Sequence, residues 1–152
     1  MSAEFTDEQL AIINEVDGLL KVLASPENLK IRFQDQLSID QVHLATLLGN
    51  LGEILADFTA ETNLNYVERK YRYAKQLTEK RSKYMAGGIP HTDVSLKSEA
   101  EIETYEIRKA EVESQRCTDA IVGLMNGVEK TLTAIRDRIR VLESERLNMA
   151  RG

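Results

Sequence analysis

The chain of 152 residues contains little of what most folds use to make turns and cross-links: one cysteine, two prolines and no tryptophan. Its single cysteine, Cys117, excludes an internal disulfide bond and suits a reducing compartment. With Pro26 and Pro90 as the only prolines, the chain lacks the frequent turn residues of an all-β protein. Because the remainder is rich in helix-forming residues, the composition predicts a single all-α domain over residues 1–152.

Sequence signals for a membrane are also missing. The first ten residues, MSAEFTDEQL, have no basic region followed by an apolar run, so we expect no secretory signal. No stretch of the sequence approaches 18 uninterrupted apolar residues, so we expect no membrane-spanning helix. Together these observations predict a cytoplasmic protein that has no membrane partner.

Residue types that carry catalysis or bind metals are few. His43 and His91 are the only histidines, and with one cysteine they make no zinc site. Gly87–Gly88 lacks the lysine and the spacing of a phosphate-binding loop. A group of glutamates has no histidine at a suitable offset and is a weak metal signal: Glu99, Glu101, Glu103, Glu106, Glu111 and Glu113. We therefore predict that the protein is not an enzyme and holds no metal and no cofactor.

The first third of the chain predicts one clear helix and one ambiguous segment. Thr6, followed three residues later by Gln9, forms a capping-box pattern that predicts a helix over residues 7–24. Ser25–Pro26 ends this helix. In residues 29–37 apolar and charged residues alternate, which favours a strand, but no second strand exists to pair with it. We interpret residues 29–37 as a short helix or an extended linker.

Two long helices are predicted in the rest of the chain. Ser38 and Gln41 make a second capping box, which predicts a helix over residues 39–86. A glycine-rich loop over residues 87–95 follows, and Ser95 or Ser98 caps a last helix over residues 97–148. This last helix carries a nearly heptad stripe of apolar residues, typical of coiled-coil packing: Cys117, Ile121, Leu124, Val128, Leu132, Ile135, Ile139 and Leu142.

These elements predict a long antiparallel helical hairpin with the N-terminal helix packed at its open end. The open end is expected to be apolar, and the tip, made of residues 66–116, to be polar. Each long helix spans about 70 Å at about 1.5 Å per residue. Since one short helix cannot cover two such partners, we expect the protein to form a homo-oligomer.

Basic and aromatic residues are concentrated between residues 66 and 84. Seven bases stand there against two acids, roughly +5 by count, in a chain whose net charge is -5. Bases bind phosphates and tyrosine rings stack on unpaired nucleobases, so the mixture is typical of a surface for single-stranded nucleic acid. The predicted nucleic-acid-binding residues are Arg69, Lys70, Arg72, Lys75, Lys80, Arg81, Lys83, Tyr71, Tyr73 and Tyr84.

Two other interpretations of this basic strip remain open. Residues 97–116 carry six glutamates against four bases, so the strip could pair with this acidic helix across the hairpin. The strip or its tyrosines could also contact a partner protein or a second subunit. An isoelectric point near 5.2 adds weight to protein partners.

The basic helix ends with Lys80, Arg81, Lys83 and Tyr84, the loop contains Gly87 and Gly88, and Ser98 and Glu99 open the acidic helix. Together with the apolar amphipathic end of the chain, this layout resembles the phage UvsY-type recombination mediators over roughly residues 66–140. The resemblance implies a ring-like homo-oligomer in the cytoplasm of a phage host. It also implies binding to single-stranded DNA and help in loading a recombinase onto strands covered by single-strand-binding protein. Lys80, Arg81 and Lys83 would contact phosphates.

The sequence therefore predicts a non-enzymatic accessory factor of DNA recombination or replication that binds single-stranded DNA, recombination proteins, or both. The alternative is a protein–protein adaptor or inhibitor that does not bind nucleic acid directly. A phage-encoded protein is one form of this alternative. A third class is a structural coiled-coil component of a larger particle.

Overall fold

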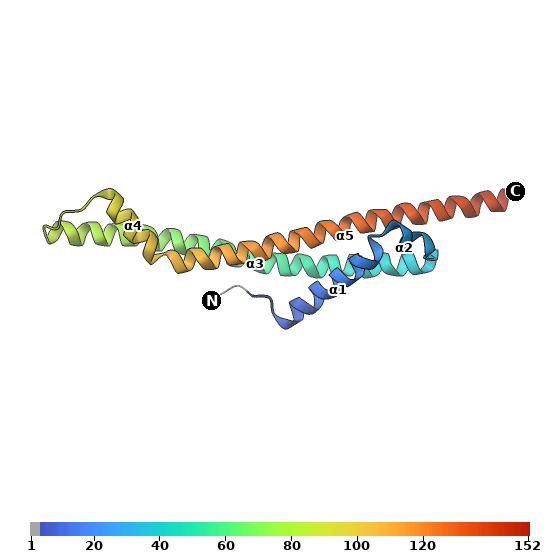
Figure 1. The fold of residues 1–152 in the computed structure, drawn as a ribbon, viewed down its shortest axis with the longest axis horizontal. Coiled ribbons are helices and arrows are strands. Elements are labelled where there is room, and N and C mark those ends of the chain that lie inside the picture. Colours follow the sequence, from blue (N-terminus) through green and yellow to red (C-terminus); the bar gives the residue numbers. More distant parts are fainter. Residues whose placement is uncertain (1–3) are drawn as a thin grey trace. The chain divides into compact units, whose positions relative to one another are not determined.

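The computed structural model describes residues 4–152, and over this range it contains helices and no strand, which confirms the all-α prediction (Figure 1). The helices are α1 (Asp7–Leu23), α2 (Pro26–Ile31), α3 (Gln34–Ala86), α4 (Asp93–Glu103) and α5 (Tyr105–Arg151). The predicted packing of the long helix α3 against the C-terminal helix is also confirmed. None of the helices within residues 4–152 is both long enough and apolar enough to cross a membrane.

The chain divides into two compact units. Unit 1 is made mainly of Asp57–Thr118, and unit 2 of Phe5–Ala56 and Asp119–Gly152. The boundaries fall inside α3 and inside α5, so each unit combines one part of each long helix with shorter elements. Unit 1 contains all of α4, and unit 2 contains α1 and α2.

Unit 2 has an aliphatic core to which α1, α2, α3 and α5 all contribute. The predicted capping box starts α1: the amide of Gln9 donates to Thr6 Oγ1 (3.2 Å), and the amide of Thr6 donates to Gln9 Oε1 (3.0 Å). At its middle, α1 is joined to α3 by a 2.7 Å contact between Glu15 and His43. The buried apolar residues of this unit are Val16, Leu23, Leu29, Leu37, Leu44, Leu47, Leu51, Ile54, Ile121, Val128, Leu132 and Ile135.

The predicted start of the long helix at residue 39 is wrong. Residues 26–31 form the short helix α2, and α3 already begins at Gln34 after two connecting residues. Ser38 therefore lies inside the helix, and its hydroxyl donates to the carbonyl of Gln34 (3.1 Å) instead of capping. The alternating pattern of residues 29–37 thus marks the end of one helix and the start of the next.

The predicted helix over residues 97–148 is in fact two helices, and both of its predicted N-caps, Ser95 and Ser98, lie inside the first of them. Helix α4 starts at Asp93 because Thr92 caps it: the amide of Ser95 donates to Thr92 Oγ1 (3.1 Å), and the amide of Thr92 donates to Ser95 Oγ (3.1 Å). Thr104 separates α4 from α5 with φ -96° and ψ 3°. Its buried hydroxyl donates to the carbonyl of Ala100 (2.9 Å).

The connection between α3 and α4 begins with a glycine turn, as the sequence predicts. Gly88 has φ +61°, a conformation that glycine adopts without a steric penalty. The amide of Ile89 donates to the carbonyl of Tyr84 (2.9 Å), and the amide of Gly88 donates to that of Met85 (3.3 Å). This pair of hydrogen bonds is the Schellman motif, which ends α3 and satisfies its last carbonyls.

Unit 1 has a smaller apolar interior than unit 2. Its buried apolar residues are Phe58, Leu96 and Ala100, and they are accompanied by two buried hydroxyl residues, Thr104 and Ser114. Burial of so few apolar side chains provides a limited hydrophobic contribution to stability. Ion pairs and side-chain hydrogen bonds also join α3 to α4 and α5 in this unit.

Candidate nucleic-acid interface

The basic strip lies on α3 within unit 1, and the structure pairs most of its charge with acids. Five of its seven bases form ion pairs, three of them with acids on α4 or α5 and two with acids one turn away on α3. Internal pairing, one of the interpretations that the sequence left open, therefore accounts for much of the strip. The five paired bases are Arg69, Arg72, Lys75, Lys80 and Arg81.

Arg69 is held by Glu111 on α5. Its Nε donates to Glu111 Oε2 at 2.6 Å, and its Nη2 donates to Glu111 Oε1 at 3.4 Å, so the guanidinium contacts both carboxylate oxygens. This hydrogen bonding raises the pKa of Arg69. Both side chains are mostly buried, so Arg69 stays paired with Glu111 when no ligand is bound.

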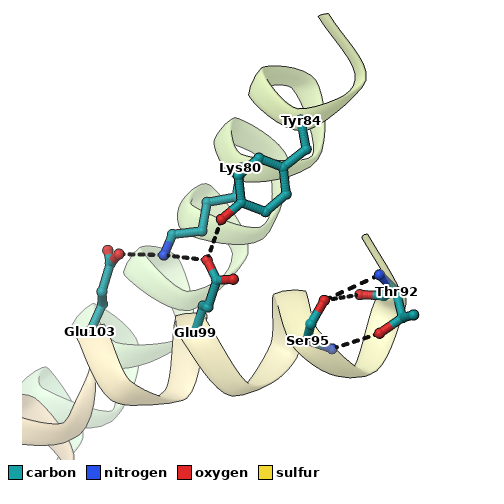
Figure 2. Close-up of polar contacts among 6 residues, drawn as sticks. All are labelled: Lys80, Tyr84, Thr92, Ser95, Glu99 and Glu103. Carbon is teal, nitrogen blue, oxygen red and sulfur yellow. Dashed lines mark hydrogen bonds and ion pairs between the residues drawn. The ribbon is translucent and has the colours of Figure 1, made fainter. Parts of the chain in front are cut away.

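A four-residue cluster, called here the tip cluster, joins α3 to α4: Lys80, Tyr84, Glu99 and Glu103 (Figure 2). Lys80 Nζ donates to Glu99 Oε2 (3.0 Å) and also contacts Glu103, while Tyr84 Oη donates to the same Glu99 oxygen (2.8 Å). The hydrogen bonds from Tyr84 and Lys80 lower the pKa of Glu99. The bonds to Glu103 and Glu99 raise the pKa of Lys80, and the bond to Glu99 raises that of Tyr84.

The other three ion pairs of the strip are on the surface. Arg81 Nη2 lies 3.0 Å from Asp93 Oδ1 at the start of α4. Arg72 contacts Glu68 (2.6 Å), and Lys75 lies at the longer distance of 3.8 Å from Glu79. Exposed pairs of this kind contribute about 0–1 kcal/mol each, so these bases can exchange their acid for a phosphate at low cost.

Two bases of the strip, Lys70 and Lys83, form no ion pair with any of the residues that the structure describes. Lys83 is exposed near the end of α3. The ammonium of Lys70 lies 5.6 Å from the ring centre of Tyr66, and the guanidinium of Arg69 lies 5.5 Å from the same ring. Cation–π contacts leave an exposed ammonium able to bind an anion as well.

Lys70 lines a cavity of about 240 Å³ between α3, α4 and α5, within unit 1. Arg108 of α5 lines the same cavity and, like Lys70, has no ion-pair partner within residues 4–152. Three bases and one acid therefore surround this cavity, two of the bases without an acid partner. Its lining residues are Arg69, Lys70, Tyr73, Glu101, Thr104 and Arg108.

The three predicted tyrosines lie in different surroundings. Tyr73 is half-buried in the wall of the 240 Å³ cavity. Tyr84 belongs to the tip cluster, where its hydroxyl is hydrogen-bonded to Glu99. Tyr71 is exposed on another side of α3 and lines a separate hollow. The structure thus brings Lys70, Tyr73 and the side chain of Arg69 together, and it places the remaining predicted site residues elsewhere on the unit.

Arg108 was not among the residues predicted from the sequence. It lies in the window 97–116, where six glutamates outnumber four bases and make the local charge negative. Glu111 lies about one turn further along α5 and Glu101 lines the same cavity, so periodicity does not separate Arg108 from the acids. Only the register of α5 against α3 shows that Arg108 and Lys70 line one cavity.

Within residues 4–152, no three histidine, cysteine, aspartate or glutamate side chains are grouped so as to hold a metal ion. Cys117 is half-buried, and its burial raises the pKa of the thiol, which favours the unreactive protonated form. No protein-family model, curated protein or solved structure matches the chain in sequence or fold comparisons.

The contribution of the tip cluster to the stability of the folded state should depend on pH. The lowered pKa of Glu99 means that this carboxylate stabilises the folded state above its ordinary pKa of 4.5, and that the contribution is lost as the pH falls through the lower folded-state value. The pKa values of Lys80 and Tyr84 are raised in the folded state. Their contribution to stability is therefore lost at alkaline pH, above their ordinary pKa values of 10.5 and 10.0. We expect Glu99→Gln to lower the melting temperature at neutral pH, with a difference from the wild type that shrinks in acid.

Thermal denaturation followed by circular dichroism at several pH values between about 3 and 8 measures this difference. Glu106→Gln is the matched control, because Glu106 is exposed on α5 and forms no ion pair with the described residues. A difference for Glu99→Gln that stays constant down to pH 3 would show that the ionised carboxylate does not stabilise the tip.

Proposed function

We propose that the protein is a non-enzymatic accessory factor of DNA recombination or replication that binds single-stranded DNA through unit 1. The observation that supports this proposal is the cavity where Lys70 and Arg108, two bases without acid partners among the described residues, lie beside Tyr73. The resemblance of residues 66–140 to UvsY-type mediators points to the same class of function.

The proposed mechanism separates bases that hold the fold together from bases that bind phosphate. Arg69 and Lys80 keep α3 attached to α5 and α4 through Glu111 and through Glu99. Lys70 and Arg108 are the phosphate ligands, because neither must release a carboxylate before it binds.

Arg81 is exposed on the same side of α3 as Lys70, three turns further along, and extends the contact along the DNA strand. Arg72, Lys75 and Lys83 are exposed on other sides of the helix. Tyr73 in the cavity wall is the aromatic side chain placed to stack on an unpaired base. Self-association and contact with a recombinase or a single-strand-binding protein complete the proposed function.

The test is the binding of a fluorescent oligo-dT, measured by anisotropy at several salt concentrations. We expect wild-type affinity to fall steeply with salt, because bound counterions are released from the phosphates. In the double variant Lys70→Ala/Arg108→Ala, the slope of log affinity against log salt should decrease by about 0.7 for each lost phosphate contact on a single strand.

Lys130→Ala is the control for a change in net charge, since Lys130 is an exposed base on α5 in unit 2. It should leave both affinity and slope close to the wild-type values. Undetectable oligo-dT binding at low salt contradicts the proposal outright. Binding that is equally strong in the double variant contradicts the assignment of Lys70 and Arg108.

A second candidate function, a protein–protein adaptor or inhibitor, is favoured by exposed apolar residues at the start of α3. Ile39 and Val42 are exposed and, with Ser38 and His43, line a hollow of about 460 Å³ in unit 2. Such a surface fits an apolar side chain of a partner. A complex with a purified recombinase or single-strand-binding protein that survives nuclease treatment, together with no oligo-dT binding, would favour this function over the first.

A further inference from the structure

Helix α3 carries a second regular stripe within unit 1, here called the outer stripe: Ala60, Leu64, Val67, Tyr71, Ala74 and Thr78. Successive members are separated by four, three, four, three and four residues, which is the heptad spacing of a coiled-coil helix. Its three large members are exposed, Leu64 by 71%, Val67 by 63% and Tyr71 by 66%. Apolar side chains at coiled-coil spacing are therefore open on this face.

The outer stripe lies on the side of α3 that unit 1 does not use. The residues of α3 that reach α4 and α5 include Arg69, Tyr73 and Lys80. Val67 and Tyr71 each precede a residue of that inner side by two positions, and two residues turn a helix by about 200°. The fold of this unit thus leaves the outer stripe without a partner helix among its own described residues.

The shape of the stripe fits a helix. A hollow of about 410 Å³ is lined by Glu79 and by four residues at regular helical spacing, Tyr71, Ala74, Lys75 and Thr78. Those four positions are i, i+3, i+4 and i+7, the diamond of residues that receives one side chain of a facing helix in knobs-into-holes packing. A hollow of this outline can receive one apolar side chain of a facing helix.

We propose that the outer stripe binds the same stripe of a second copy of the chain, with the two α3 helices antiparallel. The charged residues at the two ends of the outer stripe favour a second copy as the partner and an antiparallel direction of the two helices. Asp57 and Glu61 lie at the N-terminal end of the stripe without a base beside them, whereas at its C-terminal end Lys75 and Lys83 outnumber the one acid, Glu79. A parallel pair would place like charges together at each end, and an antiparallel pair places opposite charges together.

One antiparallel register pairs every member of the stripe. In this register the two-fold axis of the dimer passes residue 69 of both helices. Leu64 of one copy then faces Ala74 of the other and fits into its hollow, and Val67 faces Tyr71. On one flank Glu61 meets Lys75 of the second copy, twice in the dimer. Lys75 is free to change partner because Glu79 holds it only at 3.8 Å, and Glu61 has no ion pair with the described residues.

The same register brings the two Lys70 side chains onto the other flank, where their repulsion weakens the dimer. It also gives Tyr71 a role different from that of Tyr73: Tyr71 contacts the second copy, and Tyr73 stays in the cavity beside Lys70. This inference depends on the self-association part of the proposed function and not on DNA binding, so all measurements are made without DNA.

The first test is the molecular mass of the full chain by sedimentation equilibrium from about 1 to 200 µM protein. We expect a monomer–dimer equilibrium, and we expect Leu64→Lys to raise the dimer dissociation constant by about tenfold or more, equivalent to about 1.4 kcal/mol or more. Val94→Lys is the matched control, because Val94 is 74% exposed on α4 in the same unit; it should leave the constant unchanged. Circular dichroism verifies that both variants are helical.

The second test is a charge exchange. Glu61→Lys should weaken the dimer, and adding Lys75→Glu in the same chain should restore it, because the two positions meet only in the antiparallel arrangement. A chain that stays monomeric at 200 µM overturns the inference. So does a larger species that Leu64→Lys leaves intact, although that result keeps self-association through another surface. A dimer that the exchange fails to restore overturns the antiparallel arrangement.

Discussion

Leu51→Ala is expected to lower the free energy of unfolding by about 2–5 kcal/mol, because it opens a cavity in the aliphatic core of unit 2. Leu51 lies on α3 and is fully buried. Leu44, one heptad earlier, and Ile121 on α5 are fully buried in the same unit, so the helices around the site are fixed by many contacts and cannot collapse into the space. A total stability of about 5–15 kcal/mol makes this loss a large fraction of the whole.

Urea denaturation followed by circular dichroism at 222 nm measures this loss, since nearly all described residues are helical. Val42→Ala is the control: Val42 is exposed on the same helix and in the same unit, so its truncation should change stability by no more than about 0.5 kcal/mol. Equal losses for the two variants would contradict the description of unit 2 as the stabilising core of the chain.

The helices could be predicted from the sequence wherever capping and apolar spacing agree. Thr6 with Gln9 starts α1 as expected, and Gly88 ends α3 through its positive φ. The prediction failed at Ser38, where a capping pattern lies inside a helix. There the backbone was already helical from Gln34, so the serine hydroxyl bonds to that carbonyl instead.

The break at Thr104 gave no sequence signal, since threonine is common in helices. Its hydroxyl donates to the carbonyls of Ala100 and Glu101, while the residue itself is buried. A side chain that competes for helix carbonyls in this way bends or interrupts a helix. Periodicity alone cannot show which threonine does so, because the outcome depends on what packs over it.

Within the candidate site, the location of the basic strip could be predicted, but the state of each charge could not. Local pairs such as Arg72 with Glu68 follow from a spacing of four residues. The pairs Arg69–Glu111 and Lys80–Glu99 depend on the register between helices, which is set by the glycine turn and by the break at Thr104. The same register places Arg108 and Lys70 in the walls of one cavity, and no local pattern in the sequence encodes that arrangement.

Arg69→Met is expected to destabilise the protein by about 1.5–3 kcal/mol, the usual range for losing a hydrogen bond to a charged group. Only 23% of the Arg69 side chain and 19% of the Glu111 side chain are exposed. Removing the guanidinium leaves the Glu111 carboxylate mostly buried without the cation that offsets its lost hydration, and this unpaired charge is the larger part of the cost. Arg72→Met, the control, removes an exposed base and should cost at most about 1 kcal/mol.

The double variant Arg69→Met/Glu111→Met decides whether the pair stabilises unit 1 or only tolerates burial. If the single losses come mainly from an unpaired charge, the double variant should be more stable than Arg69→Met alone, because two apolar side chains replace a desolvated ion pair. Urea denaturation of the wild type, both single variants and the double variant gives the coupling energy directly. Losses that simply add in the double variant would mean that Arg69 and Glu111 act independently, and that the polar contact between α3 and α5 does not hold unit 1 together.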